Sequence, residues 1–156
     1  RVPESTLSSV GQRPFRVDYV TACGMLVRRQ VLETVGLFDE RYFMYFEDAD
    51  FCRRTREAGH QIWCVPGARM WHKVSLSANK QKPAMRYAEA WGRAQFYRRH
   101  PHGFSPVLTS AYLLAQSAAT TLRDLLSGEW ELIKAQWMGV LDGHRDRTSR
   151  LSDFFS

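Results

Sequence analysis

The chain has 156 residues, of which 44% are hydrophobic and 24% are charged. These fractions exclude a globally disordered protein, and the length is sufficient for one domain with a hydrophobic core. The net charge of +6 at pH 7 is spread over several short basic clusters. Because no zinc-finger, RNA-recognition or basic-zipper pattern accompanies these clusters, we do not expect nucleic acid as a partner.

The N-terminal segment, residues 1–14, is polar, starts without a methionine and predicts a loop cut out of a longer protein. Residues 17–27 are rich in β-branched and small apolar side chains and predict one or two buried strands, broken near Gly24. A short helix over 28–35 should end at Gly36. A structured aromatic loop is expected over 37–46.

Acids followed by arginines predict a helix over 47–58, which Gly59 ends. A strand is then expected over 61–65, followed by a second short strand or extended run over 68–72 and a polar loop over 74–82. The cysteines are odd in number, widely spaced and without a CxxC pair, which favours reduced thiols in a cytoplasmic setting. They are Cys23, Cys52 and Cys64.

The second half of the chain predicts three helices. Pro83 opens the first, which runs to about His100 and should bury Ala84, Ala88, Trp91 and Ala94 or Gln95 along one side. Ser105 and Pro106 start the second, which runs to about 126. The last is amphipathic, spans about 129–141 and carries Trp130, Ile133, Trp137 and Val140 at helical spacing. A polar tail follows.

The second of these helices is uncharged from Phe104 to Leu122 but contains too many polar residues to span a bilayer. Two interpretations remain open. One is an amphipathic helix on a membrane surface, flanked by Arg98, Arg99 and Arg123. The other is an ordinary buried helix, or one that packs on the rest of the protein or on a partner.

An acidic triplet, Glu47, Asp48 and Asp50, lies where the aromatic loop turns into a helix. A carboxylate at a helix N-terminus could remove a proton from an acceptor hydroxyl during glycosyl transfer. Alternatively, the first two acids only cap the helix and Asp50 pairs with Arg53 or Arg54. Spacing alone favours this second interpretation.

Six short pieces of sequence, in this order, resemble bacterial family-2 glycosyltransferases, especially the rhamnosyltransferase-like group. They are TACGMLVRR at 21–29, VGLFDE at 35–40, FMYFEDADFCRR at 43–54, AG at 58–59, VP at 65–66 and WH at 71–72. Each piece is weak alone, and their order and spacing make them specific. The resemblance covers about a third of the chain strongly.

The resemblance implies an α/β fold: the C-terminal part of a GT-A (Rossmann-like) domain with a few short strands, followed by a helical region. It assigns residues 15–82 to the acceptor and catalytic-base half, 83–146 to the helical region and 147–156 to the tail. Asp48-x-Asp50 has the spacing of the family's metal motif but opens a helix. Because no upstream D-x-D and no glycine-rich phosphate loop is present, the donor-binding half should be missing and the fragment alone inactive.

The resemblance also assigns the site residues. Asp48 would be the catalytic base, and the acceptor would be bound by Glu47, Tyr45, Phe46, Cys23 and Gly24. His72 and Arg54 would bind the nucleotide-diphosphate sugar, with His72 also a ligand of Mg²⁺ or Mn²⁺. Asp50 would be structural.

The implied function is that of an inverting, hexosyltransferase-type enzyme of cell-envelope polysaccharide synthesis. Its donor would be a nucleotide sugar such as dTDP-rhamnose, and its acceptor a saccharide or a polyprenyl-linked sugar. We expect it in the cytoplasm, with peripheral contact at the inner face of the membrane, and homo-oligomers remain open. The rival hypothesis is a non-catalytic interaction or oligomerisation module that lacks the donor-binding half.

Overall fold

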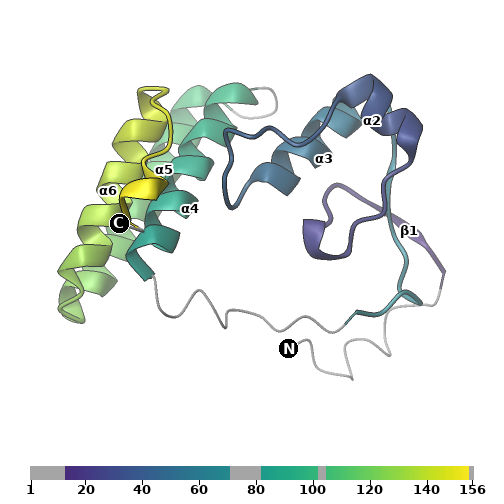
Figure 1. Ribbon diagram of the computed structural model, residues 1–156. Helices are drawn as coiled ribbons and strands as arrows, with labels where there is room; N and C mark the ends of the chain where they lie inside the picture. The colour runs from purple at the N-terminus through teal and green to yellow at the C-terminus, as the bar shows by residue number, and fades with distance from the viewer. Residues whose placement is uncertain (1–12, 71–81, 102–104, 155–156) are drawn as a thin grey trace. The chain divides into compact units, whose positions relative to one another are not determined.

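The computed structural model describes residues 13–70, 82–101 and 105–154 (Figure 1). The chain divides into two compact units. The strand-containing unit comprises the described residues of 1–39 and 48–74, and the helical unit comprises those of 40–47 and 75–156. Each unit is described by itself.

The strand-containing unit is built on one antiparallel pair of strands. Strand β1 (Phe15–Val17) pairs with β2 (Ile62–Cys64), with Phe15 opposite Cys64 and Val17 opposite Ile62. The 3-10 turn η1 (Ala22–Gly24) and helices α2 (Arg29–Val35) and α3 (Glu47–Glu57) lie between the two strands in sequence. Both helices are followed by a glycine with φ +83°, a left-handed conformation in which L side chains are strained.

The predicted ends of α2 and α3 are therefore confirmed at Gly36 and Gly59. The predicted buried strands over 17–27 are wrong, because only Val17 lies in a strand and residues 22–24 form η1. Most of this segment is exposed, and the backbone N–H of Ala22 donates to the carboxylate of Asp48 and not to a strand partner.

Of the short strand or extended run predicted over 68–72, the described part, residues 68–70, is exposed and forms no strand. A turn closed by the Ala68 N–H to the Val65 carbonyl (3.0 Å) ends the extended segment at this point. Residues 71–72 and most of the predicted loop over 74–82 lie outside the described residues, and Lys82 already belongs to the next helix.

Three helices form the helical unit, in which α6 packs against both α4 and α5 (Figure 1). They are α4 (Lys82–Arg99), α5 (Pro106–Leu126) and α6 (Trp130–His144). The predicted buried side of the first helix is confirmed, because all five of its residues are buried. The core of the unit comprises Tyr42, Ala84, Tyr87, Ala88, Trp91, Ala135 and Leu151.

Helices α4 and α6 approach each other closely along two glycines of α6. A Cβ atom on Gly139 would lie 2.5 Å from the Tyr87 carbonyl oxygen, and one on Gly143 would lie 2.8 Å from the Trp91 carbonyl oxygen. Such distances are sterically forbidden, so the contact requires residues without side chains at both positions.

This close contact corrects the prediction for the last helix. The face that packs on α4 carries small and polar residues, whereas Trp130, placed on the apolar stripe by its spacing, is 64% exposed. The helix also continues past 141 to His144. In the segment predicted as a polar tail, Leu151 is buried, and the 3-10 turn η3 (Leu151–Phe154) packs on α4. The domain limits from the resemblance stay a prediction.

The described part is thus mostly helical with one small sheet. This is consistent with a portion of an α/β domain, and the Rossmann-like arrangement stays a prediction.

We predict that Gly139→Ala destabilises the helical unit by about 1–2 kcal/mol, because overpacking at the α4–α6 contact outweighs the better helix propensity of alanine. Chemical denaturation followed by circular dichroism measures the change. Gly67→Ala is the control, since nothing lies within 4 Å of a Cβ atom at that position. Equal stability of both variants and the wild type would refute the tight contact.

Candidate functional site

The carboxylate of Asp48 is held in place by donors from two separate segments. Its Oδ2 accepts hydrogen bonds from the Tyr19 hydroxyl (2.8 Å) and from the backbone N–H of Ala22 (3.1 Å). Its Oδ1 accepts one from the N–H of Ala49 (2.8 Å). The residue sits in the first turn of α3, where the helix dipole favours a negative charge. These contacts fix the orientation of a partly buried carboxylate.

The turn η1 brings two predicted acceptor-binding residues to the same place. Cys23 and Gly24 directly follow Ala22, whose N–H contacts Asp48. Cys23 is exposed, and its Sγ lies 2.9 Å from the Thr21 Oγ1. The structure therefore groups Asp48, Cys23 and Gly24 within the strand-containing unit. Tyr19 was missed by sequence reasoning, because nothing in the local pattern connects it to a residue 29 positions later.

Asp50 and Arg54 form an ion pair within α3, and Arg54 also holds the preceding segment. The Arg54 guanidinium donates to Asp50 Oδ2 (2.7 Å) and to the carbonyl oxygens of Val35 (2.8 Å) and Leu37 (2.9 Å). The side chain of Asp50 is 4% exposed. The predicted pairing of Asp50 with a neighbouring arginine is confirmed. The predicted contact of Arg54 with the donor stays a prediction, because the described contacts of this side chain are structural.

Tyr45, Phe46 and Glu47 belong to the helical unit. Tyr45 and Phe46 have φ angles of 65° and 69°, a left-handed conformation that costs energy for residues other than glycine. Gly92 of α4 makes room for them, because a Cβ atom there would lie 3.0 Å from the Phe46 ring. Phe46 also packs against Phe96, with ring centroids 5.7 Å apart.

The Tyr45 hydroxyl donates to the Met85 sulfur at 3.4 Å. Burial and the nearby carboxylates of Glu89 and Glu47 raise the pKa of Tyr45, so its hydroxyl stays neutral. Packing on α4 therefore holds this segment in a strained conformation, and such strain often occurs at functional sites.

His72, the predicted metal and donor ligand, lies outside the described residues. Among the residues that are described, no group of three or more His, Cys, Asp or Glu could hold a metal ion. Asp48 and Asp50 do not act as a pair, since Asp50 is buried against Arg54. The described residues do not fit a metal site, so the predicted Mg²⁺ or Mn²⁺ would need ligands outside them.

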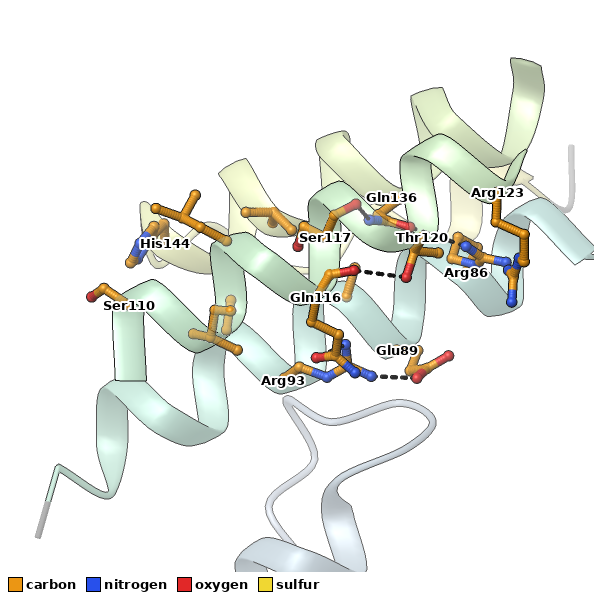
Figure 2. A pocket seen from close by; sticks show the side chains of 15 residues that line it. Arg86, Glu89, Arg93, Ser110, Gln116, Ser117, Thr120, Arg123, Gln136 and His144 are labelled. Carbon is orange, nitrogen blue, oxygen red and sulfur yellow. Dashed lines mark hydrogen bonds and ion pairs between the residues drawn. The ribbon is translucent and has the colours of Figure 1, made fainter. Parts of the chain in front are cut away.

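A pocket of about 370 Å³ lies between α4, α5 and α6 (Figure 2). Arg86, Arg93 and Arg123 line it together with polar side chains from all three helices. None of the residues predicted as site residues lines it. The pocket was not expected from the sequence, because its residues come from three helices whose packing the pattern does not specify.

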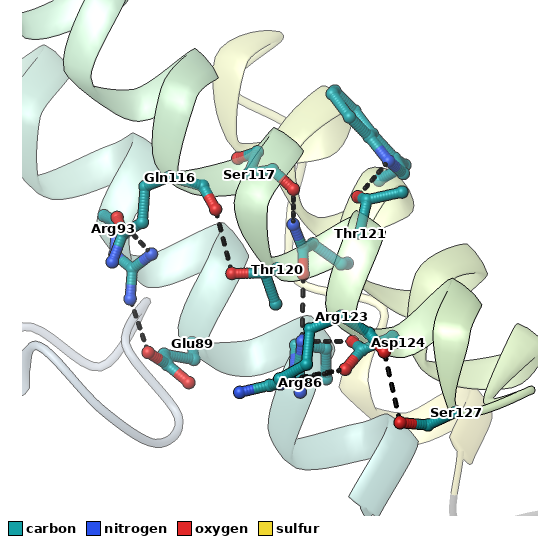
Figure 3. Close-up of polar contacts among 12 residues, drawn as sticks. Arg86, Glu89, Arg93, Gln116, Ser117, Thr120, Thr121, Arg123, Asp124 and Ser127 are labelled. Carbon is teal, nitrogen blue, oxygen red and sulfur yellow. Dashed lines mark hydrogen bonds and ion pairs between the residues drawn. The ribbon is translucent and has the colours of Figure 1, made fainter.

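The arginines of this pocket are matched by acceptors of the same unit (Figure 3). Arg86 Nη1 donates to Asp124 Oδ2 (2.6 Å) and to Gln136 Oε1 (3.0 Å). Arg123 pairs with the other oxygen of Asp124 at 2.9 Å. Arg93 donates to Gln116 Oε1 (2.7 Å) and pairs with Glu89. These contacts form a structural polar layer between the helices, and we assign no substrate to this pocket.

The sequence model of a family described as glycosyltransferase like family 2 matches residues 5–94. Because this match covers more than half of the chain, the protein belongs to this family, and the resemblance inferred from the short motifs is confirmed. No solved structure matches the chain. None of the helices in the described part of the chain has the length and apolar character needed to cross a bilayer.

Three curated relatives are similar over part of the chain. An N-acetylglucosaminyl-diphospho-decaprenol L-rhamnosyltransferase of Mycobacterium tuberculosis is 41% identical over 69 residues, which are 44% of this chain and 22% of that protein. A dTDP-rhamnosyl transferase of Shigella flexneri is 31% identical over 64 residues, 41% of this chain and 22% of that protein. A rhamnosyltransferase of Escherichia coli is 32% identical over 82 residues, 53% of this chain and 30% of that protein. The matches span less than a third of each relative's length.

We predict that Arg54→Met destabilises the strand-containing unit by about 3 kcal/mol, because the buried carboxylate of Asp50 loses its guanidinium partner. The free energy of unfolding, measured in urea, tests this. The control is Arg29→Met, which removes an ion pair between side chains that are 91% and 61% exposed, and should change stability by less than about 0.5 kcal/mol. A stable Arg54→Met variant with weakened nucleotide-sugar binding would instead support the role implied by the resemblance.

Proposed function

We propose that the intact protein is an inverting glycosyltransferase in which Asp48 is the catalytic base. The observation that carries this proposal is the carboxylate of Asp48, fixed at the start of α3 by Tyr19 and Ala22 and beside the exposed η1 turn. Its neighbour on the same helix, Asp50, is buried in an ion pair and is therefore unsuited to the role.

The hydrogen bonds of Asp48 indicate which of its oxygens would accept the proton. Among the described residues, Oδ2 accepts from both Tyr19 and Ala22, whereas Oδ1 accepts from the N–H of Ala49 alone. A carboxylate oxygen has two lone pairs in its plane. Oδ1 therefore keeps one lone pair for an incoming hydroxyl, and Oδ2 serves to orient the group.

In the proposed step, Oδ1 takes the proton of the acceptor hydroxyl while the hydroxyl oxygen attacks the anomeric carbon. The new carbon–oxygen bond forms as the bond from the anomeric carbon to the nucleoside diphosphate breaks on the opposite side. The electron pair of that bond leaves with the diphosphate. A single in-line displacement of this kind inverts the anomeric configuration.

The family and the names of the relatives support a proposal for the substrates. The names of the relatives above specify rhamnosyl transfer, in one case with dTDP as the nucleotide and in another with a diphospho-decaprenol acceptor. We infer a nucleotide-diphosphate sugar donor, with dTDP-rhamnose favoured, and a saccharide or lipid-linked acceptor of cell-envelope polysaccharide. Such acceptors would place the protein in the cytoplasm, in peripheral contact with the membrane.

The other residues that the resemblance assigns also belong to the proposal. Glu47, Tyr45, Phe46, Cys23 and Gly24 would bind the acceptor, and His72 would bind the donor diphosphate and its divalent metal. The metal would offset the charge that develops on the leaving diphosphate. The rival, a non-catalytic module, is not favoured because the chain belongs to a glycosyltransferase family.

We expect Asp48→Asn in the full-length protein to lower sugar transfer by about 10²–10⁴-fold, because the amide cannot accept the proton. Transfer of rhamnose from dTDP-rhamnose to a lipid-linked acceptor is the assay. Asp18→Asn is the matched control, since this carboxylate is 81% exposed and pairs only at the surface with Arg56. If Asp48→Asn keeps full activity, the proposed base is wrong and the non-catalytic module gains support.

Tyr19 should act as a positioning residue. Tyr19→Phe removes one of the two donors that hold Oδ2, so we predict a fall in kcat of roughly 3- to 30-fold, the equivalent of one hydrogen bond. KM for the donor should stay unchanged. Because the side chain is 46% exposed, the melting temperature should also stay close to that of the wild type. A loss of stability with normal kcat would show a merely structural role.

A further inference from the structure

Helix α5 is amphipathic, but unlike an ordinary surface helix it turns its polar side towards its own unit. Its inner side contacts α4 and α6 through the side chains of Asp124 and Gln116 and through the Ser117 carbonyl. Leu113 and Leu114 line the pocket between the three helices, and the other apolar side chains face outward. Ten residues are exposed on that side, which we call the outer face: Val107, Leu108, Ala111, Tyr112, Ala115, Ala118, Ala119, Leu122, Leu125 and Leu126.

The outer face is wide and uninterrupted. At 3.6 residues per turn, its ten residues cover a continuous arc of roughly 140°, and the helix is about 30 Å long. No charged residue lies within this arc, and its large side chains are strongly exposed, for example Val107 at 75% and Leu126 at 81%. A contiguous apolar surface of this kind normally has a binding partner.

The polar contacts on the inner side explain why α5 does not rotate about its axis to bury its leucines. Asp124 is 3% exposed and is held by Arg86 and Arg123, and the Trp137 indole donates to Thr121 at 3.0 Å (Figure 3). Rotating α5 to bury its leucines would break these contacts and leave the Arg86 guanidinium, whose side chain is only 17% exposed, without its carboxylate partner, which is costly. The outward direction of the apolar face is therefore fixed by the fold.

The charge of residues 82–154 and the aromatic residues at the outer face point to its partner. Residues 82–154 contain ten Lys or Arg against seven Asp or Glu, an excess of three positive charges. Arg123 borders the face with a side chain that is 65% exposed. Tyr112 lies on the face and Trp130 follows the helix, 54% and 64% exposed. Basic residues and amphipathic aromatic rings are the groups that favour the interface of an anionic bilayer.

We propose that α5 is an interfacial helix, which lies on an anionic lipid bilayer with its outer face in the boundary between headgroups and acyl chains. A second copy of the chain would be expected to pair along a narrower apolar seam that charged residues flank on both sides. The arc of the outer face is wider than such a seam, and among the residues of α5 only Arg123 is a charged residue at its border. The proposal deepens the membrane contact in the proposed function. It depends on the helical unit alone and does not require sugar transfer.

The experiment is flotation of the full-length protein with vesicles of phosphatidylcholine and phosphatidylglycerol in equal parts, compared with phosphatidylcholine alone. The wild type should bind the anionic vesicles, less strongly at high salt. The double variant Val107→Glu, Leu122→Glu should bind at least about tenfold more weakly, because two apolar groups no longer enter the lipid. The control Ser110→Glu, Ser127→Glu adds the same two charges at exposed polar residues on and just after α5, outside the outer face, and should bind more strongly than the double variant.

Asp48→Asn should bind vesicles as the wild type does, so lipid binding is tested separately from catalysis. Because the replaced residues are exposed, circular dichroism should be unchanged. A second pair, Leu108→Gln and Leu126→Gln, tests the same face without added charge. The proposal is overturned if the wild type does not bind, or if both outer-face variants bind normally. A stable dimer without lipid that the same variants dissociate would also overturn it, in favour of a second copy.

Discussion

The geometry of the candidate site depends on one carboxylate that joins two segments 26 residues apart in sequence. Asp48 at the start of α3 receives the N–H of Ala22, and this contact draws the η1 turn towards the helix. An extended strand at 17–27 would have used that N–H for a strand partner. The hydrogen bond to the carboxylate replaces the strand, so the same interaction shapes the local fold and orients the proposed base.

Two aspartates on one helix have different environments because of what surrounds each of them. Asp48 meets neutral donors, a hydroxyl and two backbone N–H groups, and stays partly accessible. Asp50, two residues later, points to the interior and meets the guanidinium of Arg54. The two interpretations of the acidic triplet were thus not exclusive. Asp50 has the structural role that spacing favoured, and Asp48 remains available for the proposed role of catalytic base.

The sequence predicted what local chemistry determines and missed what distant packing determines. The helix ends at Gly36 and Gly59 followed from glycine conformation, and the start of α5 from Pro106. The buried face of α6 could not be predicted, because large aromatic residues outweigh glycines in any pattern of hydrophobicity. Only the close approach of α4 shows that Gly139 needs to face inward. The contact of Tyr19 could not be predicted either, because its hydrogen bond to Asp48 joins residues 29 positions apart.

The direction in which the apolar face of α5 points is another feature that the sequence could not predict. Periodicity identifies two faces of a helix but not which one points to the protein, and the usual assumption is that the apolar face is buried. Here the polar face is the one with partners, because Arg86 and Gln136 on the neighbouring helices supply them for Asp124 and the Ser117 carbonyl. A buried ion pair contributes little net stability, yet breaking it is costly. The pair therefore fixes the rotation of α5, and the leucines face outward as a consequence.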